Sequence, residues 1–296
     1  MTQFNFEAIG TTWQIDVYKK ITLGQENKLF SEIQNCINVF DQNYSRFRCD
    51  SLVTKMSKET GVFELPNDAE KMITLYHELY LKTDGLFTPL VGNLLSDAGY
   101  DKNYTLKQKK ELVVPFLWDE AIEFNAPMLT IKKPVMLDFG AAGKGYLIDL
   151  VSKVIEENDI WEYCVDAGGD ILYKNKTSIK IGLENPENLN QVIGVCTLEK
   201  GSLCGSAGNR RKWANFTHII NPKTLTSPEE IVAVWVIADE TILADALATC
   251  LFFVPPSNLM EEYNFEYVII KKENSLKSDV SLYTEKSENF PVEFFS

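Results

Sequence analysis

The chain has 296 residues, a length that allows one large domain or two small ones and can bury a sizeable core. Hydrophobic residues make up 45% of the chain and charged residues 24%, an ordinary composition for a globular protein. The net charge of −13 argues against nucleic acid and an anionic membrane surface as partners. It also means that an anionic ligand would need local positive charge.

The hydrophobic pattern of the first third predicts one strand region and two helices. Residues 1–20 alternate as in a strand, and apolar positions spaced by three and four predict a helix over about 25–41. A second helix is expected to begin near Asn67, in a capping box with Glu70, and to run to about Lys82.

The rest of the chain mixes strand-like and helical runs without a regular βαβ rhythm. The polar stretch 99–112 is typical of an exposed excursion. We therefore predict an α+β fold, one compact body in a single domain over 1–296. The further strand patterns lie at 128–132, 162–166, 178–183, 192–198, 232–238 and 266–271.

Several common kinds of site and segment are disfavoured. The six cysteines form no C-x-x-C pair and several lie in apolar runs, so buried free thiols are expected. Only two histidines are present, which argues against a histidine-rich zinc site. No run approaches the length of a membrane span. Residues 1–20 lack the features of a signal peptide, so we expect a cytoplasmic protein, or an exported or lipid-anchored one if a leader has been removed.

The segment Leu137–Asp149, LDFGAAGKGYLID, carries the strongest local signal. It follows the strand-like run at 128–132, and helical spacing begins at Tyr146. Small residues fill the turn between them, so the main-chain N–H groups and the dipole of the helix start could bind an anion. Lys144 adds a point charge suited to phosphate. The glycine spacing fits neither a P-loop nor G-x-G-x-x-G, and a turn that only packs the helix on a sheet stays open.

The second signal is the almost wholly apolar segment Glu240–Val254. Asp245 and Thr249 stand one helical turn apart, on the same face. A buried carboxylate there needs a cation, a lysine or several N–H donors. Oxygen ligands of this kind suit Mg²⁺ or Ca²⁺ rather than zinc. Alternatively, Asp245 is a helix cap or half of an ion pair.

These two segments resemble motifs of the ApbE family of FAD:protein FMN transferases. Other landmarks of that family follow in its order, and although each is weak alone, their common order over about residues 7–254 is specific. The resemblance implies a compact α+β body with the flavin between its two halves. The landmarks are Ala8–Trp13, Tyr44–Phe47, Asp50–Ser51, Asp84–Pro89, Val165–Asp170, Ile181–Pro186, Ser206–Asn209 and Thr217–Pro222.

The resemblance implies transfer of FMN from FAD to a threonine hydroxyl of an acceptor protein, with release of AMP. It implies a Mg²⁺ ion held by Asp245, Thr249 and the backbone carbonyl of Ala141, with Lys144 and the glycine turn on phosphate. Asp138 would accept a hydrogen bond from the flavin or its ribityl chain. The implied FAD site also includes Ile9, Phe47, Leu86, Phe87, Thr88, His218 and Ile220.

His218 has two interpretations. It lies in an apolar, strand-like run, where a lone histidine is more often a hydrogen-bonded core residue, and on a strand Ile220 would share its face. The resemblance instead places it beside the flavin phosphate, as general base for the acceptor hydroxyl.

Three motifs depart from the family pattern, and these departures keep other functions open. Asn221 stands where the family usually has Asp, Thr88 replaces the Asp of a Gly-x-Phe-Asp turn, and Ser206-Ala-Gly replaces Thr-Ser-Gly. One alternative is a protein that cleaves FAD to FMN and AMP without an acceptor, or only holds FAD. Another is a Mg²⁺-dependent enzyme that acts on a different phosphate ester.

Overall fold

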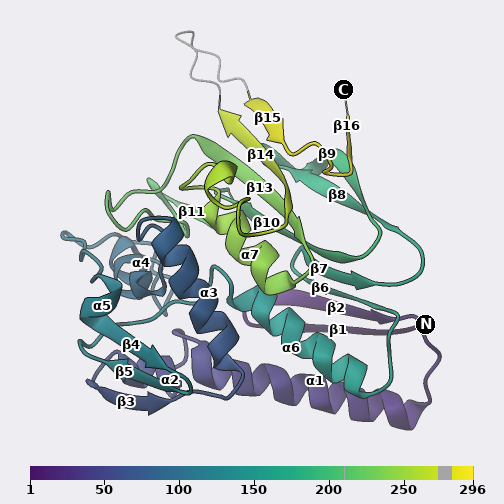
Figure 1. Cartoon of the computed structure of the whole chain (residues 1–296), viewed down its shortest axis with the longest axis horizontal. Helices are drawn as coiled ribbons and strands as arrows, with labels where there is room; N and C mark the ends of the chain where they lie inside the picture. The colour runs from purple at the N-terminus through teal and green to yellow at the C-terminus, as the bar shows by residue number, and fades with distance from the viewer. Residues whose placement is uncertain (210, 273–281, 296) are drawn as a thin grey trace.

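The computed structural model describes residues 1–209, 211–272 and 282–295. A large antiparallel sheet of eight strands runs through the middle of the molecule (Figure 1). Its strands, in spatial order, are β1 (Thr2–Ala8), β2 (Thr11–Val17), β6 (Tyr163–Ala167), β7 (Asp170–Lys174), β10 (Gly201–Ala207), β13 (Ile231–Ala238), β14 (Glu266–Lys272) and β15 (Leu282–Lys286).

Three smaller sheets complete the β-structure of the described residues. They are β16 (Val292–Phe294), β9 (Asn188–Leu198) and β8 (Ile179–Asn185), then β3 (Gly61–Glu64), β5 (Met128–Ile131) and β4 (Ile122–Asn125), and the short pair β11 (Lys212–Trp213) and β12 (Phe216–Thr217).

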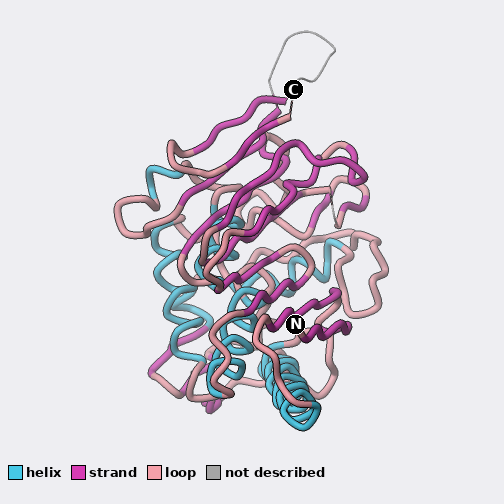
Figure 2. Tube along the Cα trace, turned by 90° about the vertical axis from the view of Figure 1, so that its right-hand side faces the viewer, coloured by secondary structure: helices cyan, strands magenta, loops and turns pink. Residues whose placement is uncertain are grey.

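The helices gather mainly on one face of the large sheet, as the two perpendicular views show (Figures 1 and 2). None of the helices in the described part of the chain is both long and apolar enough to cross a membrane. The α-helices are α1 (Leu23–Tyr44), α2 (Leu52–Met56), α3 (Ala69–Lys82), α4 (Gly92–Ala98), α5 (Trp118–Ala121), α6 (Gly143–Glu157) and α7 (Thr241–Cys250), and the 3₁₀ turns are η1 (Pro89–Val91) and η2 (Pro256–Asn258).

Alternation along the strands explains why the large sheet is covered on both faces. In β6, Tyr163 and Val165 point into the core shared with the helices, whereas Cys164 points into a second core under the β8–β9–β16 sheet. The second core also contains Leu183 of β8 and Cys196 of β9. The α+β prediction is confirmed, and its strand patterns correspond to β5, β6, β8, β9, β13 and β14.

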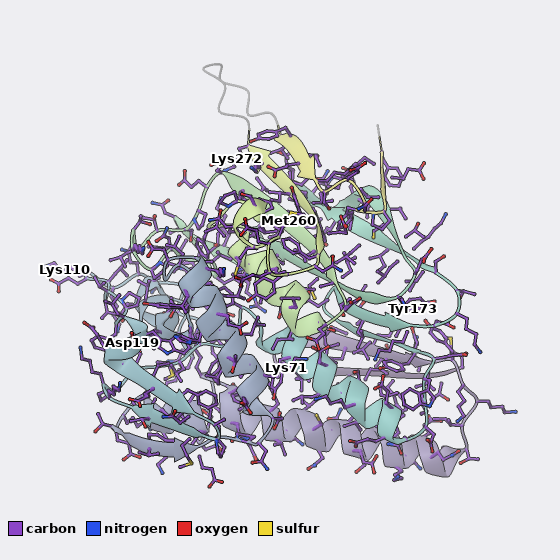
Figure 3. All side chains as sticks on the ribbon, in the orientation of Figure 1. Lys71, Lys110, Asp119, Tyr173, Met260 and Lys272 are labelled. Atoms are coloured by element: carbon purple, nitrogen blue, oxygen red, sulfur yellow. The ribbon has the colours of Figure 1, made fainter. Side chains whose placement is uncertain are left out.

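Two details of the sequence prediction are corrected. The capping box of the second helix is wrong, because α3 begins at Ala69 after Asp68, which makes no side-chain cap. The Asp68 carboxylate instead accepts a hydrogen bond from the Tyr146 hydroxyl, so it is turned away from its own helix start. In the excursion, residues 102–111 are exposed as expected and Lys110 projects from the rim of the molecule (Figure 3), but Tyr100 is buried.

Candidate functional site

A cavity of about 920 Å³ opens where the first turn of α6, the end of α1 and the β8–β9 hairpin meet. This volume lies near the upper end of the range for small-molecule sites. All twelve residues singled out from the sequence line it, although they come from both ends of the chain. They are Ile9, Phe47, Leu86, Phe87, Thr88, Asp138, Ala141, Lys144, His218, Ile220, Asp245 and Thr249.

Helices α6 and α7 cap one another at the cavity wall. Asp149 of α6 accepts hydrogen bonds from the main-chain N–H groups of Thr241 (3.0 Å) and Ile242 (2.9 Å), at the start of α7. In return, Oδ2 of Asp245 accepts the N–H of Gly145 in the first turn of α6, at 2.8 Å. Neither helix is capped by the side chain of its own N-cap residue. Each helix start is therefore held by a carboxylate of the other helix.

The crossing depends on the absence of a side chain at Gly145. A Cβ atom there would lie 2.3 Å from the carbonyl oxygen of Thr241 and 2.8 Å from the Cβ of Asp245. Both contacts are too short for real atoms, and the first involves main chain that cannot swing away. This glycine of the turn is thus required by close packing of two helices, which is the structural alternative left open for the motif.

Lys144 lies among buried carboxylates. Its ammonium group forms an ion pair with Asp170, whose side chain is only 2% exposed. Asp170 also accepts the N–H of Gly205 at 3.1 Å. Burial raises the pKa of Asp166 and of Asp245, and the charge of Lys144 opposes both shifts. Binding of phosphate by Lys144 stays a prediction, because in this structure its partner is a carboxylate.

Asp138 is fully engaged by the protein. One of its oxygens forms an ion pair with Arg46, and the other accepts the N–H of Gly140 at 2.7 Å. The carboxylate thus fixes the glycine turn and the end of the segment after α1. The expected hydrogen bond from the flavin to Asp138 stays a prediction. It would have to use the same carboxylate oxygens that already contact Arg46 and Gly140.

Arg46 and the rings around it form a second wall of the cavity. The Arg46 guanidinium lies 4.2 Å from the ring centre of Phe47 and 4.9 Å from that of Tyr100. Tyr104, from the exposed excursion, stacks on Phe47 with ring centres 5.5 Å apart and planes 12° apart. Sequence reasoning missed Arg46 as a site residue, although it stands in the Tyr-Ser-Arg-Phe motif.

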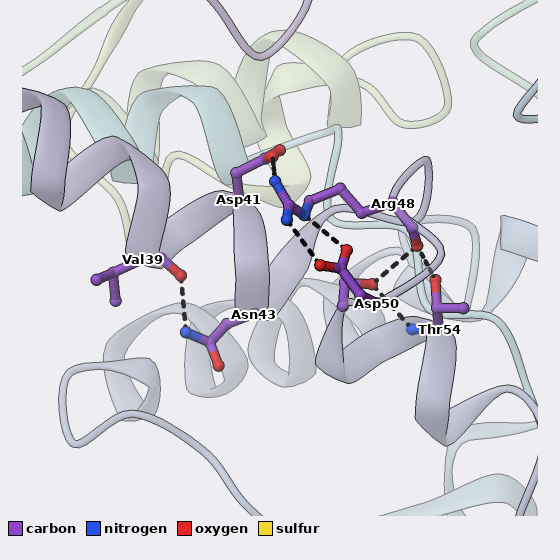
Figure 4. Close-up of polar contacts among 7 residues, drawn as sticks. Val39, Asp41, Asn43, Arg48, Asp50 and Thr54 are labelled. Atoms are coloured by element: carbon purple, nitrogen blue, oxygen red, sulfur yellow. Dashed lines mark hydrogen bonds and ion pairs between the residues drawn. The ribbon is translucent and has the colours of Figure 1, made fainter.

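Arg48 directly follows Phe47, and its polar contacts (Figure 4) fix the turn that carries Arg46 and Phe47. The Arg48 guanidinium donates to Asp41 of α1 at 3.1 Å and to both carboxylate oxygens of Asp50, at 2.9 and 3.0 Å. Its carbonyl accepts the Thr54 hydroxyl at 2.6 Å. These contacts connect the end of α1 to α2 and so fix the conformation of the turn that carries the aromatic wall.

His218 lies in a bend just after β12, not on a strand, so the expected sharing of a strand face with Ile220 is wrong. Strand β12 contains only two residues, because Thr217 bends the chain by donating its hydroxyl to the Ile219 carbonyl at 3.1 Å. Nδ1 of His218 is buried and has no hydrogen-bond partner within the described residues. Burial and the charges of Arg211 and Lys144 lower its pKa to about 4, so the ring is neutral near pH 7.

The departures from the family pattern act as local caps. Oδ1 of Asn221 accepts hydrogen bonds from the main-chain N–H groups of Lys223 (2.9 Å) and Thr224 (3.1 Å). The Thr88 hydroxyl accepts a hydrogen bond from the main-chain N–H of Leu90 at 3.2 Å. An Asp at either position could make the same bonds, so neither change disturbs the main chain. The Ser206 hydroxyl lies 3.5 Å from that of Thr249.

The donor set around Asp245 fits a hard cation. Within the described residues no group of three or more His, Cys, Asp or Glu side chains could hold a metal ion. Asp245 and Thr249 nevertheless both line the cavity, beside Ser206 and the turn of Ala141, and all four offer oxygen atoms. One carboxylate with hydroxyl and carbonyl oxygens is a donor set that suits Mg²⁺, which keeps part of its water or substrate shell.

The fold is an antiparallel sheet with helices on one face, and its large cavity is lined by both buried ionic groups and aromatic rings. These features are those of an α+β ligand-binding protein. Residues 9–269 match the model of the ApbE family, and the chain belongs to that family. It is 25% identical over 294 residues to a FAD:protein FMN transferase of Buchnera aphidicola, across 91% of this chain and 85% of the relative. A Haemophilus influenzae protein with the same name is 25% identical over 90% of this chain and 86% of its own.

Solved structures share the fold. The crystal structure of the ApbE protein from Thermotoga maritima superposes with a TM-score of 0.80 at 22% identity, covering 99% of both chains. The flavin transferase ApbE from Vibrio cholerae gives a TM-score of 0.79 at 20% identity, covering 98% of this chain and 97% of its own. The arrangement of sheets and helices described above is therefore the fold of these solved structures.

Proposed function

We propose that this chain transfers FMN from FAD to a hydroxyl group, that of a threonine, on an acceptor protein. The names of its relatives support FAD as substrate and a protein as acceptor. The observation that carries the proposal is one cavity with three kinds of group in its lining. They are the neutral imidazole of His218, whose Nδ1 has no hydrogen-bond partner among the described residues, a lysine at a helix start, and the oxygen donors of Asp245 and Thr249.

The reaction balances as a phosphoryl transfer. The acceptor oxygen forms a bond to the FMN-side phosphorus of the pyrophosphate, and the bond from that phosphorus to the bridging oxygen breaks. AMP leaves with the bridging oxygen, and the proton of the hydroxyl passes to a base. FMN stays on the protein as a phosphodiester. Such a reaction depends chiefly on positioning and on neutralising charge.

His218 fits the role of base. An imidazole that is neutral near pH 7 can accept a proton, and its buried Nδ1 has no partner in the described part of the chain. Asn221, which follows it closely, is engaged in its own turn and orients no charge toward the ring.

The pyrophosphate would lie along the start of α6. The glycine turn offers N–H groups and the positive end of the helix dipole, and Lys144 can exchange its carboxylate partner for a phosphate oxygen. Asp245, Thr249 and the carbonyl of Ala141 would hold Mg²⁺, which when bound neutralises charge on the pyrophosphate oxygens. The aromatic wall of Phe47 and Tyr104 would receive a planar ring of the dinucleotide.

The test is intact-mass spectrometry of an acceptor protein after incubation with this chain, FAD and Mg²⁺. We expect the acceptor to gain one FMN group less water, with an equal amount of AMP released. An acceptor in which the target threonine is replaced by alanine is the matched control. FMN and AMP released with no gain of acceptor mass would show an FAD pyrophosphatase instead. Protein that neither turns yellow with FAD nor consumes it would exclude flavin altogether.

A further inference from the structure

Strand β8 ends its sheet, and no strand of the described residues pairs with its other edge. The order of that sheet is β16–β9–β8, so β8 has a partner on one side only (Figure 1). It pairs regularly with β9 from Ile179 to Leu183 before the register shifts. Beyond this ladder, no hydrogen bond between described residues reaches the main chain of Ile179–Leu183.

The register shows which groups face the open edge. The N–H of Thr197 donates to Pro291 and the carbonyl of Ile193 accepts from Phe295, so the odd-numbered residues of β9 point their main-chain groups toward β16. The even-numbered residues of β9 therefore bond to β8, where their partners carry odd numbers. The N–H and C=O groups of Lys180 and Gly182 in β8 consequently point away from β9, to the open edge.

This edge lies at the cavity. Four consecutive residues of β8, 181–184, line it together with Lys144, Asp245 and the aromatic wall of Phe47. Ile181 is half-buried and Leu183 is fully buried in the core beneath, so these side chains anchor the strand. Gly182 presents main chain alone, and a Cβ atom there would lie 2.8 Å from Cγ1 of Val192. Because Gly182 has no side chain, a second strand could approach the edge there without a steric clash.

We propose that an extended segment of the acceptor protein adds to β8 as an antiparallel or parallel strand and thereby delivers its threonine to the cavity. This inference rests on the proposed function, since it names how the acceptor of that reaction is held. Open ladder groups give a peptide affinity that does not depend on its side chains. The alternation of a strand would place the reacting residue and every second neighbour on the face toward the cavity.

The open edge is better suited to a polypeptide than to the dinucleotide. Lys180 and Gly182 offer alternating donors and acceptors in one row, which a strand matches group for group. Ordinary proteins protect such an edge with lysine, proline or a bulge. Here Lys180 stands at the outer end, and the register shift begins only after Leu183, so neither a lysine nor a bulge covers Gly182, which lines the cavity.

The probe is a synthetic peptide of about ten residues, near the upper length of a strand, cut around the threonine that gains mass in the experiment above. Single N-methyl groups are placed at successive positions of this peptide, and KM for the peptide is measured at saturating FAD. We expect KM to rise about three- to tenfold at two positions spaced two residues apart, where hydrogen bonds to Lys180 and Gly182 are lost, and to change little at the positions between and beyond them. The positions between are the matched control.

A protein variant gives an independent test. Lys180→Pro removes the outward N–H but no bond to β9, and Lys180→Ala keeps that N–H while removing the same charge. We expect Lys180→Pro alone to raise KM for the peptide about three- to tenfold, with the affinity for FAD unchanged in both. Should Lys180→Pro fail to fold, the N-methyl series still decides.

The outcomes separate the two proposals. N-methyl effects without a period of two, or a Lys180→Pro variant that weakens FAD rather than the peptide, would overturn strand addition while FMN transfer stands. A wild-type protein that gives no acceptor a gain in mass would overturn the proposed function and the acceptor site with it.

Discussion

Two walls of the same cavity are built in opposite ways. The ionic wall, around Lys144, Asp170 and Asp245, is buried, and backbone N–H groups hold both carboxylates. The aromatic wall, around Phe47, is completed by Tyr104, which is 53% exposed and comes from the excursion. The difference teaches that charged groups of a site must be fixed before the ligand arrives, because buried dipoles stabilise ligand charge without rearranging. An aromatic ring that stacks on a ligand can instead come from a segment at the surface.

The largest effect is expected when the ionic wall loses its metal-facing carboxylate. Asp245→Asn keeps an oxygen that can accept the Gly145 N–H but removes the charge. We expect FMN transfer to fall roughly 10⁴-fold or more and to lose its dependence on Mg²⁺. The free energy of unfolding should hold or rise, because burial raises the pKa of this carboxyl and the neutral amide avoids that cost.

Asp149→Asn is the control, because Asp149 caps the partner helix and does not line the cavity. It should lower the free energy of unfolding by about 1 kcal/mol and leave turnover nearly unchanged. Transfer rates, Mg²⁺ titration and chemical denaturation measure both variants. Wild-type turnover in Asp245→Asn would remove Asp245 from the metal site.

The second largest effect is expected at His218, the proposed base for the acceptor hydroxyl. His218→Asn should cut transfer by about 10²–10⁴ and leave the affinity for FAD within a few-fold. Because the pKa of His218 is lowered to about 4, the ring is protonated only below that value, and kcat/KM of the wild type should fall as the pH drops toward 4. The acid limb of the variant should be less steep than that of the wild type, because His218 no longer takes up a proton while Asp245, whose pKa is raised by burial, still can. Loss of FAD affinity together with an unchanged pH profile would mark His218 as a packing residue.

The third effect tests whether Lys144 serves phosphate or only its buried partner. Lys144→Met should weaken FAD about tenfold to hundredfold and riboflavin far less, since only FAD carries phosphate. It also leaves Asp170 buried without its cation, which should lower the free energy of unfolding by about 3 kcal/mol. The double variant Lys144→Met/Asp170→Asn should recover the stability but not the affinity. Isothermal titration of both flavins and denaturation curves separate the roles, and equal weakening of the two flavins would assign Lys144 to structure.

The smallest effect is expected at the aromatic wall. Tyr104→Ala removes one stacked ring and should weaken FAD and riboflavin alike, by about two- to tenfold, because the contact is to a ring and not to phosphate. Leu106→Ala is the matched control, as it lies in the same excursion but does not line the cavity. The same titrations apply, and a change confined to FAD would assign Tyr104 to the adenosine or phosphate part of the dinucleotide instead of the flavin ring.

The sequence predicted the parts of the site that have a local signature. The glycine turn with Lys144 and the Asp245–Thr249 pair each occupy one short segment, so spacing alone placed them on helix starts and faces. The partners Arg46 and Asp170 were not assigned, because an ion pair between distant segments leaves no local pattern. The apolar run around His218 was misread as a strand for the same reason, since side-chain hydrogen bonds decide where the chain bends.

The crossed caps of α6 and α7 have a consequence for how the protein folds. Neither helix can complete its first turn alone, because the carboxylate that each needs arrives from about a hundred residues away on the other. Contacts of such long sequence separation form late, after the loop between them has closed. The amides of Gly145, Thr241 and Ile242 should therefore gain protection from hydrogen exchange in one step. We therefore expect the docking of the two helices and the appearance of the ionic wall to occur in the same step of folding.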